Sequence, residues 1–139
     1  MNFTTSGLAN ALGGTMSGDG AVSWMGVEID TRRDVKGKVF FALRGTQSDG
    51  HEFLSAAIAG GCAAVVVSQP TEVSVPVIQV EDTRKALFRL SSVVRSQLGV
   101  ETTIAITGSV GKTTSKDRLA HLLGDSVTAS QASFNNDLG

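Results

Sequence analysis

Two short apolar runs on either side of a helical stripe are the feature that most limits how this chain can fold. Residues 39–43 (Val-Phe-Phe-Ala-Leu) and 63–67 (Ala-Ala-Val-Val-Val) are apolar enough for strands covered on both faces. Between them, apolar residues recur at helical spacing within residues 53–58. A strand, a helix and a second strand in this order form a β-α-β unit, whose two strands are parallel. The sequence therefore predicts an α/β fold.

Further apolar patterns extend this unit in both directions. Alternation over residues 22–29 predicts a half-buried strand, and residues 75–80 predict another. Apolar positions within residues 8–12 follow Ser6, a candidate cap, and predict a short N-terminal helix. A longer helical stripe covers residues 87–98. Together these elements predict a small, self-contained α/β domain.

The pattern changes near residue 100, which divides the predicted chain into two domains, 1–100 and 101–139. The β-branched run 103–107 (Thr-Ile-Ala-Ile-Thr) predicts a buried strand that leads into a glycine-containing loop and a further helix. Only residues 127–129 remain as another strand candidate. A buried strand needs neighbours on both sides, so we expect the second domain to be the incomplete start of a parallel-sheet domain.

The loop that follows this predicted strand has the chemistry of a phosphate-binding site. Gly108 and Gly111 let successive backbone N–H groups turn toward an anion, and Lys112 can reach the terminal phosphates of a nucleotide. The hydroxyl of Thr113 is an oxygen donor of the kind that Mg²⁺ prefers. Ile106 stands where the general Walker pattern has its first glycine. The alternative is an ordinary strand-to-helix turn.

Composition and charge exclude several other classes of protein. With 41% hydrophobic and 18% charged residues, the chain is expected to be a soluble globular protein. A formal net charge of −1 provides no sequence-wide attraction to nucleic acid or to an anionic membrane, and no stretch approaches the ~18 apolar residues of a membrane span. The single cysteine, Cys62, lies in a small apolar run and is predicted to be a buried thiol. We expect a cytoplasmic monomer.

Several of these segments together resemble the Mur ligase family. Residues 107–114 (Thr-Gly-Ser-Val-Gly-Lys-Thr-Thr) resemble its variant phosphate loop, T-G-x-x-G-K-T/S. Residues 30–32, 37–45 and 49–53 resemble the uridine-nucleotide-binding domain of the members that extend the stem peptide at its third and at its fourth and fifth positions. The first of these blocks commonly reads D-S-R, and the threonine found here keeps the hydroxyl. Residues 133–139 resemble the segment after the first ATPase helix in the member that adds D-alanyl-D-alanine.

The resemblance implies an ATP-dependent carboxylate-amine ligase of peptidoglycan precursor synthesis, with ATP and Mg²⁺ as cofactors. It would join D-alanyl-D-alanine to UDP-N-acetylmuramoyl-tripeptide through an acyl phosphate. Lys112 is the expected catalytic residue and Thr113 the expected metal ligand, and we expect this chain alone to be inactive. The expected nucleotide-binding residues are Thr107, Gly108, Ser109, Val110, Gly111, Lys112, Thr113 and Thr114. The expected substrate-binding residues are Thr31, Arg32, Thr46, Gln47, Asp49, His51, Asn135 and Asn136.

The same sequence features are compatible with other interpretations. The chain could belong to the related ligase that adds the third stem-peptide residue, to a different P-loop phosphotransferase or ATPase, or to a non-catalytic nucleotide-sugar-binding module. Individual residues also have plainer alternatives: Arg32 as a solvated turn residue, His51 as the start of a helix, and Asn135 and Asn136 as turn residues.

Overall fold

The computed structural model describes residues 3–45 and 48–130 of the 139-residue chain. The chain divides into two compact units, Met1–Val100 and Glu101–Gly139, which are described separately. Among the described residues, no helix is long and apolar enough to cross a membrane.

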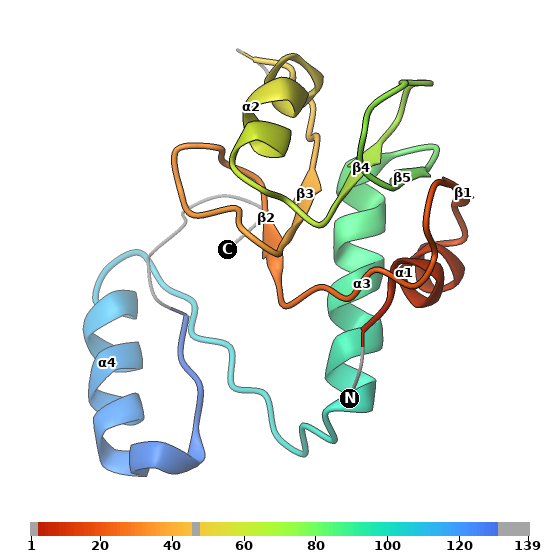
Figure 1. Ribbon diagram of the computed structural model, residues 1–139. Helices are drawn as coiled ribbons and strands as arrows, with labels where there is room; N and C mark the ends of the chain where they lie inside the picture. Colours follow the sequence, from red (N-terminus) through yellow and green to blue (C-terminus); the bar gives the residue numbers. More distant parts are fainter. Residues whose placement is uncertain (1–2, 46–47, 131–139) are drawn as a thin grey trace. The chain divides into compact units, whose positions relative to one another are not determined.

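The first unit is built on a five-stranded sheet in the order β1-β5-β4-β3-β2 (Figure 1). The four strands from β5 to β2 are parallel, and β1 pairs with β5 in the antiparallel sense. The predicted β-α-β arrangement, and with it the α/β fold class, is confirmed. The strands are β1 (Thr15–Ser17), β2 (Val27–Glu28), β3 (Val39–Phe41), β4 (Ala64–Val67) and β5 (Val77–Gln79).

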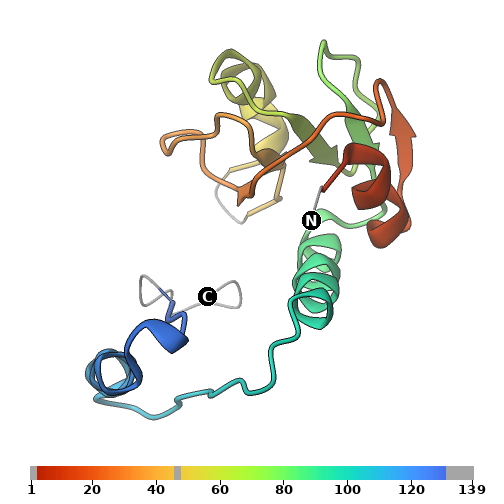
Figure 2. The same cartoon turned by 60° about the horizontal axis from the view of Figure 1, so that its bottom comes forward.

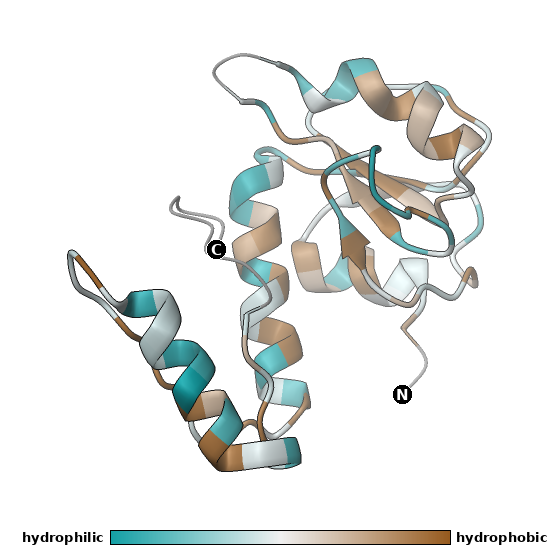
Figure 3. Ribbon diagram, turned by 90° about the vertical axis from the view of Figure 1, so that its left-hand side faces the viewer, coloured by the Kyte–Doolittle hydropathy of each residue, from teal (hydrophilic) through white to brown (hydrophobic). Residues whose placement is uncertain are grey.

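Helices cover both faces of this sheet (Figures 2 and 3). On one face lie α1 (Thr5–Leu12) and α3 (Thr83–Gln97), and on the other the 3₁₀ turn η1 (Gly50–Phe53) continues into α2 (Leu54–Ala59). Because successive strand residues point to opposite faces, the sheet contributes to two separate cores. The core under α1 and α3 includes Leu8, Leu12, Val39, Phe41, Val66, Ile78 and Leu90, and the core under α2 includes Val35, Phe40, Leu54, Ala57, Val65 and Val67.

Side-chain caps start the two longer helices of this unit. Thr4, not the predicted Ser6, caps α1 by accepting a hydrogen bond from the backbone N–H of Gly7 at 3.3 Å. Asp82 caps α3 by accepting from the first two N–H groups after Thr83. The buried hydroxyl of Thr83 donates to the carbonyl of Ala42 at 3.0 Å, which ties the start of α3 to the end of β3.

Tertiary pairing changes the strands at the edges of the sheet. The strand predicted over 22–29 is reduced to Val27–Glu28, because Ser23 and Trp24 instead pair with the N-terminal segment. Strand β1, which sequence reasoning did not predict, is only three residues long and forms by pairing with β5. Cys62 is buried as predicted, and this burial raises the pKa of its thiol.

The second unit contains α4 (Lys112–Leu123) and the short 3₁₀ turn η2 (Gly124–Ser126). The strands predicted over 103–107 and 127–129 are not formed. The physical reason is that a strand is stabilised by pairing, and the described part of this unit, residues 101–130, offers no paired neighbour. None of the residues of α4 is buried, and Leu122 is 80% exposed. The described part of this unit therefore has no core of its own.

Candidate functional site

The carboxyl ends of the parallel strands bring four predicted substrate residues to one edge of the sheet. Residues 30–32 follow β2, residues 44–45 and 48–51 follow β3, and Ser68 follows β4 directly. Since β2, β3 and β4 are parallel neighbours, these segments share an edge. Open α/β sheets bind ligands at this edge. The predicted residues placed here are Thr31, Arg32, Asp49 and His51.

The turn after β2 is organised by an ion pair between Asp30 and Arg32. The Arg32 guanidinium donates from Nε to Asp30 Oδ1 at 2.9 Å and from Nη2 to Oδ2 at 2.7 Å. The backbone N–H of Arg32 also donates to Oδ1, at 3.0 Å. These hydrogen bonds from Arg32 lower the pKa of the Asp30 carboxyl to about 2. The Arg32 side chain is 89% exposed, so this fork lies at the surface, where it can exchange its partner for a phosphate.

The residues after β3 are held by the carboxylate of Asp49. This carboxylate accepts the backbone N–H of His51 at 3.0 Å, the ring Nδ1 of His51 at 2.5 Å, and Nε of Arg44 at 3.2 Å. The hydrogen bonds from His51, first from its backbone and then from its ring, lower the pKa of Asp49. Asp49 therefore holds the segment between β3 and η1 in place through its hydrogen bonds to Arg44 and His51. Its position in the sequence did not reveal this role.

His51 connects this segment to the neighbouring strand. Its Nε2 accepts the backbone N–H of Ser68, the residue after β4, at 3.0 Å, and only 12% of its side chain is exposed. Both ring nitrogens are thus bonded within the chain. Sequence reasoning named His51 but missed its partner Ser68, because residues 17 positions apart have no local signal that links them.

Close backbone packing at Gly50 makes this arrangement possible. A Cβ atom at this position would lie 2.6 Å from the backbone nitrogen of Leu43 and 2.8 Å from the carbonyl carbon of Ala42. The N–H of Gly50 also donates to the carbonyl of Leu43 at 2.8 Å. Only a residue without a side chain lets η1 start against the end of β3.

The candidate phosphate loop lies in the second unit, at the start of α4. Gly108 and Gly111 have φ angles of 150° and 82°, in the region that favours glycine. A Cβ atom at Gly111 would meet nothing within 4 Å, so the backbone conformation, not lack of space, calls for glycine here. The loop is exposed to solvent, with Val110 89% exposed. The structure thus shows a turned glycine loop, not an extended one.

Lys112 folds back over this loop. Its Nζ donates to the carbonyl oxygen of Gly108 at 2.5 Å, which places a positive charge beside the loop. Thr113 follows in the first turn of α4, where its hydroxyl is a possible oxygen ligand for Mg²⁺. No group of three or more His, Cys, Asp or Glu side chains that could hold a metal occurs within residues 3–45 and 48–130. A cation at this place would depend on hydroxyl and phosphate oxygens.

Four of the predicted substrate residues cannot be assigned a place. Thr46, Gln47, Asn135 and Asn136 lie outside the described residues.

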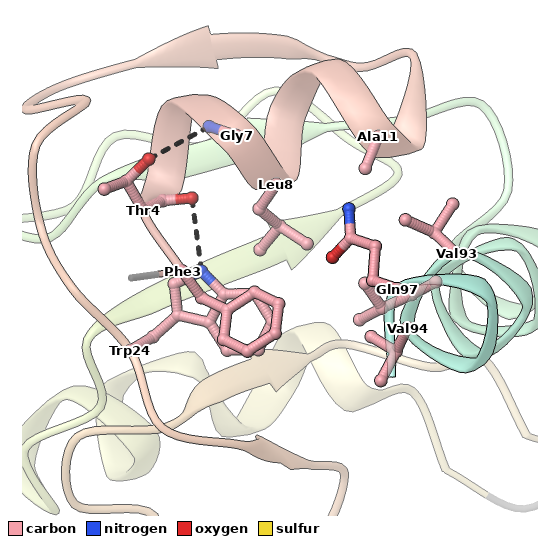
Figure 4. Close-up of a pocket in the computed structure, with 10 residues that line it drawn as sticks. Phe3, Thr4, Gly7, Leu8, Ala11, Trp24, Val93, Val94 and Gln97 are labelled. Atoms are coloured by element: carbon pink, nitrogen blue, oxygen red, sulfur yellow. Dashed lines mark hydrogen bonds between the residues drawn. The ribbon is translucent and has the colours of Figure 1, made fainter. Parts of the chain in front are cut away.

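A pocket of about 290 Å³ lies within the first unit, between α1 and α3 (Figure 4). Phe3 and Trp24 form one wall, with ring centroids 4.9 Å apart, and Val94 and Gln97 of α3 lie on the other side. The indole N–H of Trp24 donates to the carbonyl of Thr4 at 3.2 Å. Of the predicted site residues that the structure describes in the first unit, Thr31, Arg32, Asp49 and His51, none lines this pocket.

A parallel sheet with polar residues at its carboxyl edge, and a glycine loop that opens a helix later in the chain, are features typical of nucleotide-binding α/β proteins. Comparison with known proteins specifies this class further. A family model described as "Mur ligase family, catalytic domain" matches residues 24–95, which is more than half of the chain. The chain therefore belongs to the Mur ligase family.

Curated relatives extend the match over the whole chain. The UDP-N-acetylmuramoyl-tripeptide–D-alanyl-D-alanine ligases of Haemophilus influenzae and Escherichia coli are 38% and 36% identical to it, each over 100% of this chain. The matched parts are 32% and 31% of those proteins, so the chain spans about a third of their length. A UDP-N-acetylmuramoyl-L-alanyl-D-glutamate–2,6-diaminopimelate ligase from Aquifex aeolicus is 41% identical over 70% of this chain and 20% of its own length.

Solved structures show the same relationship. A crystal structure of MurF from Acinetobacter baumannii matches with a TM-score of 0.77 and 33% identity, over 88% of this chain and 27% of the other. MurF ligase from Thermotoga maritima, crystallised in complex with ADP, matches with a TM-score of 0.53 and 31% identity, over 70% of this chain and 22% of the other.

Proposed function

We propose that this chain supplies the nucleotide-sugar-binding domain and the phosphate loop of an ATP-dependent carboxylate-amine ligase. The substrates proposed are UDP-N-acetylmuramoyl-tripeptide and D-alanyl-D-alanine, with ATP as the phosphate donor. The observation that carries this proposal is the match of the entire chain, at 36–38% identity, to relatives named for that activity. The related diaminopimelate-adding ligase is the second candidate, and its match covers only 70% of the chain.

The first unit is proposed to bind the uridine nucleotide at the carboxyl edge of its sheet. The exposed fork of Arg32 can pair with a diphosphate in place of Asp30, because a guanidinium donates two parallel hydrogen bonds to either anion. Thr31 offers a hydroxyl in the same turn. Thr46 and Gln47 remain predicted contacts in this unit, as Asn135 and Asn136 do in the second.

The second unit is proposed to bind the phosphates of ATP at residues 107–114. The turned loop and the N-terminus of α4 provide backbone donors, and the ammonium of Lys112 can transfer its hydrogen bond from the Gly108 carbonyl to a phosphate oxygen. Lys112 would thereby stabilise the charge on the transferred phosphate. Thr113 would hold Mg²⁺, which when bound neutralises further charge on the phosphate oxygens. A cytoplasmic monomer remains our expectation.

Calorimetric titration of the 139-residue chain with UDP-N-acetylmuramoyl-tripeptide, and separately with Mg-ATP, tests this proposal. We expect binding of the nucleotide sugar, because its predicted site lies in the unit with a complete core. We expect weaker binding of Mg-ATP and no amide formation from the isolated chain. Binding of Mg-ATP alone would instead favour a different P-loop phosphotransferase or ATPase. Binding of neither ligand would contradict the proposed function.

A further inference from the structure

Asp49, His51 and Ser68 form a connected group, here called the His51 latch, at the carboxyl edge of the sheet. His51 Nδ1 lies 2.5 Å from Asp49 Oδ1, and His51 Nε2 lies 3.0 Å from the backbone nitrogen of Ser68. The ring is nearly buried, with 12% of the side chain exposed. Histidine commonly binds ligands directly, but here the chain itself occupies both ring nitrogens.

The partners of the ring determine its chemical state. An ionised carboxylate only accepts hydrogen bonds, so Nδ1 carries the proton that is donated to Asp49. A backbone N–H only donates, so Nε2 must keep its lone pair for Ser68. The ring is therefore the neutral Nδ1–H tautomer. The Ser68 hydroxyl, 3.4 Å from the same Nε2, is a longer and weaker contact than the 3.0 Å backbone bond.

The latch joins two segments that the sequence separates. Asp49 also accepts from Arg44, so the end of β3 is connected through His51 to the first residue after β4. At Gly50 the same segment packs directly against the backbone of Leu43. The latch thus fixes η1 across the carboxyl ends of two adjacent parallel strands.

We propose that His51 is a positioning residue for nucleotide-sugar binding and does not itself contact the ligand. It holds the start of η1 against β4 in a conformation ready to bind, so that binding does not have to order this segment. The inference rests on the proposed function, because the ligand it concerns is the UDP-linked substrate of that function. It reassigns His51 from the ligand contact expected from sequence to a support for the edge on which the ligand lies.

Variants of the whole chain that keep or remove the acceptor for Ser68 test this role. His51→Gln keeps an amide oxygen able to accept the Ser68 N–H, whereas His51→Ala leaves that donor without its partner. Ser91→Ala is the matched control, because it removes an exposed serine hydroxyl of α3 that bonds the carbonyl of Phe88 and lies outside the latch. Each variant is titrated with UDP-N-acetylmuramoyl-tripeptide, and the hydrogen exchange of the residue-68 amide is measured by NMR without ligand.

We expect His51→Ala to weaken binding about tenfold and to speed exchange of the Ser68 amide about tenfold. His51→Gln should restore the affinity and the exchange rate to within about threefold of the starting protein, and Ser91→Ala should leave both unchanged. The inference is overturned if His51→Gln protects the Ser68 amide but binds as weakly as His51→Ala, since the imidazole then contacts the ligand. It is also overturned if His51→Ala binds normally.

These results can be distinguished from failure of the proposed function. If the unmodified chain does not bind the UDP-linked probe, the proposed function is contradicted. The exchange of the Ser68 amide still shows in that case whether His51 provides the latch.

Discussion

Substitution of Gly50 by alanine should disturb the first unit and its candidate binding edge together. The added Cβ would lie 2.6 Å from the Leu43 nitrogen and 2.8 Å from both the Ala42 carbonyl carbon and the Leu43 oxygen. All three are backbone atoms, so no side-chain rotation can relieve the contact. Either η1 or the end of β3 must shift, and the 2.8 Å hydrogen bond between Gly50 and Leu43 must lengthen.

The magnitude follows from the cost of inserting a methyl group into packed structure, which is about 1–3 kcal/mol. For a unit of about one hundred residues this corresponds to a fall in Tm of about 4–8 °C for each kcal/mol. Gly26→Ala is the matched control, because its Cβ would lie 3.7 Å from the Lys38 side chain, an ordinary contact. The control also accounts for the loss of glycine flexibility in the unfolded chain, which by itself stabilises by about 0.4–1 kcal/mol.

Urea and thermal unfolding followed by tryptophan fluorescence measure this effect. Trp24 is the only tryptophan of the chain and lies in the first unit, so the signal reports on that unit. We expect Gly50→Ala to unfold at lower urea and lower temperature than both the unmodified chain and Gly26→Ala. Equal stability of the two alanine variants would show that η1 can move away from β3 at no cost, which contradicts the close packing described above.

Three further predictions concern the core, the phosphate loop and the exposed ion pair. Phe41→Ala should lower the free energy of unfolding of the first unit, measured in urea, by about 3–5 kcal/mol, because Phe41 is 0% exposed. Phe88→Ala is the control and should lower it much less, because Phe88 is 47% exposed. Equal decreases for the two variants would contradict the assigned core. Lys112→Ala should weaken the binding of Mg-ATP in calorimetry and leave the affinity for UDP-N-acetylmuramoyl-tripeptide unchanged. Loss of affinity for both ligands would show a folding defect. Unchanged affinity for both would argue against a phosphate-binding role of the glycine loop. Arg32 lowers the pKa of Asp30 from 3.8 to about 2, so this carboxylate stabilises the fold above pH 3.8 and loses that contribution as the pH falls toward about 2. Asp30→Asn should therefore reduce the change in stability across that pH window, and an unaltered acid profile would refute the assignment.

Local patterns predicted much of the first unit correctly. The apolar runs at 39–43 and 63–67 became the buried strands β3 and β4, and the stripe over 53–58 became the helical segment between them. These predictions succeeded because a strand buried on both faces is apolar throughout, and a helix buried on one face has apolar residues at regular spacing. Both patterns are visible in the sequence itself. The strand over 103–107 failed for the complementary reason: its composition suits a sheet, but pairing requires neighbours that the described residues of the second unit do not provide.

The sequence by itself determined the α/β class, the β-α-β order and the glycine loop before α4, since each depends on residues close together along the chain. The tertiary structure decided the antiparallel addition of β1, the shortening of β2 and the partners of His51. These features depend on hydrogen bonds between segments far apart in sequence, such as the bond from Ser68 to His51. No local pattern records such a pairing, because its energy is gained only after the strands have brought the two groups together.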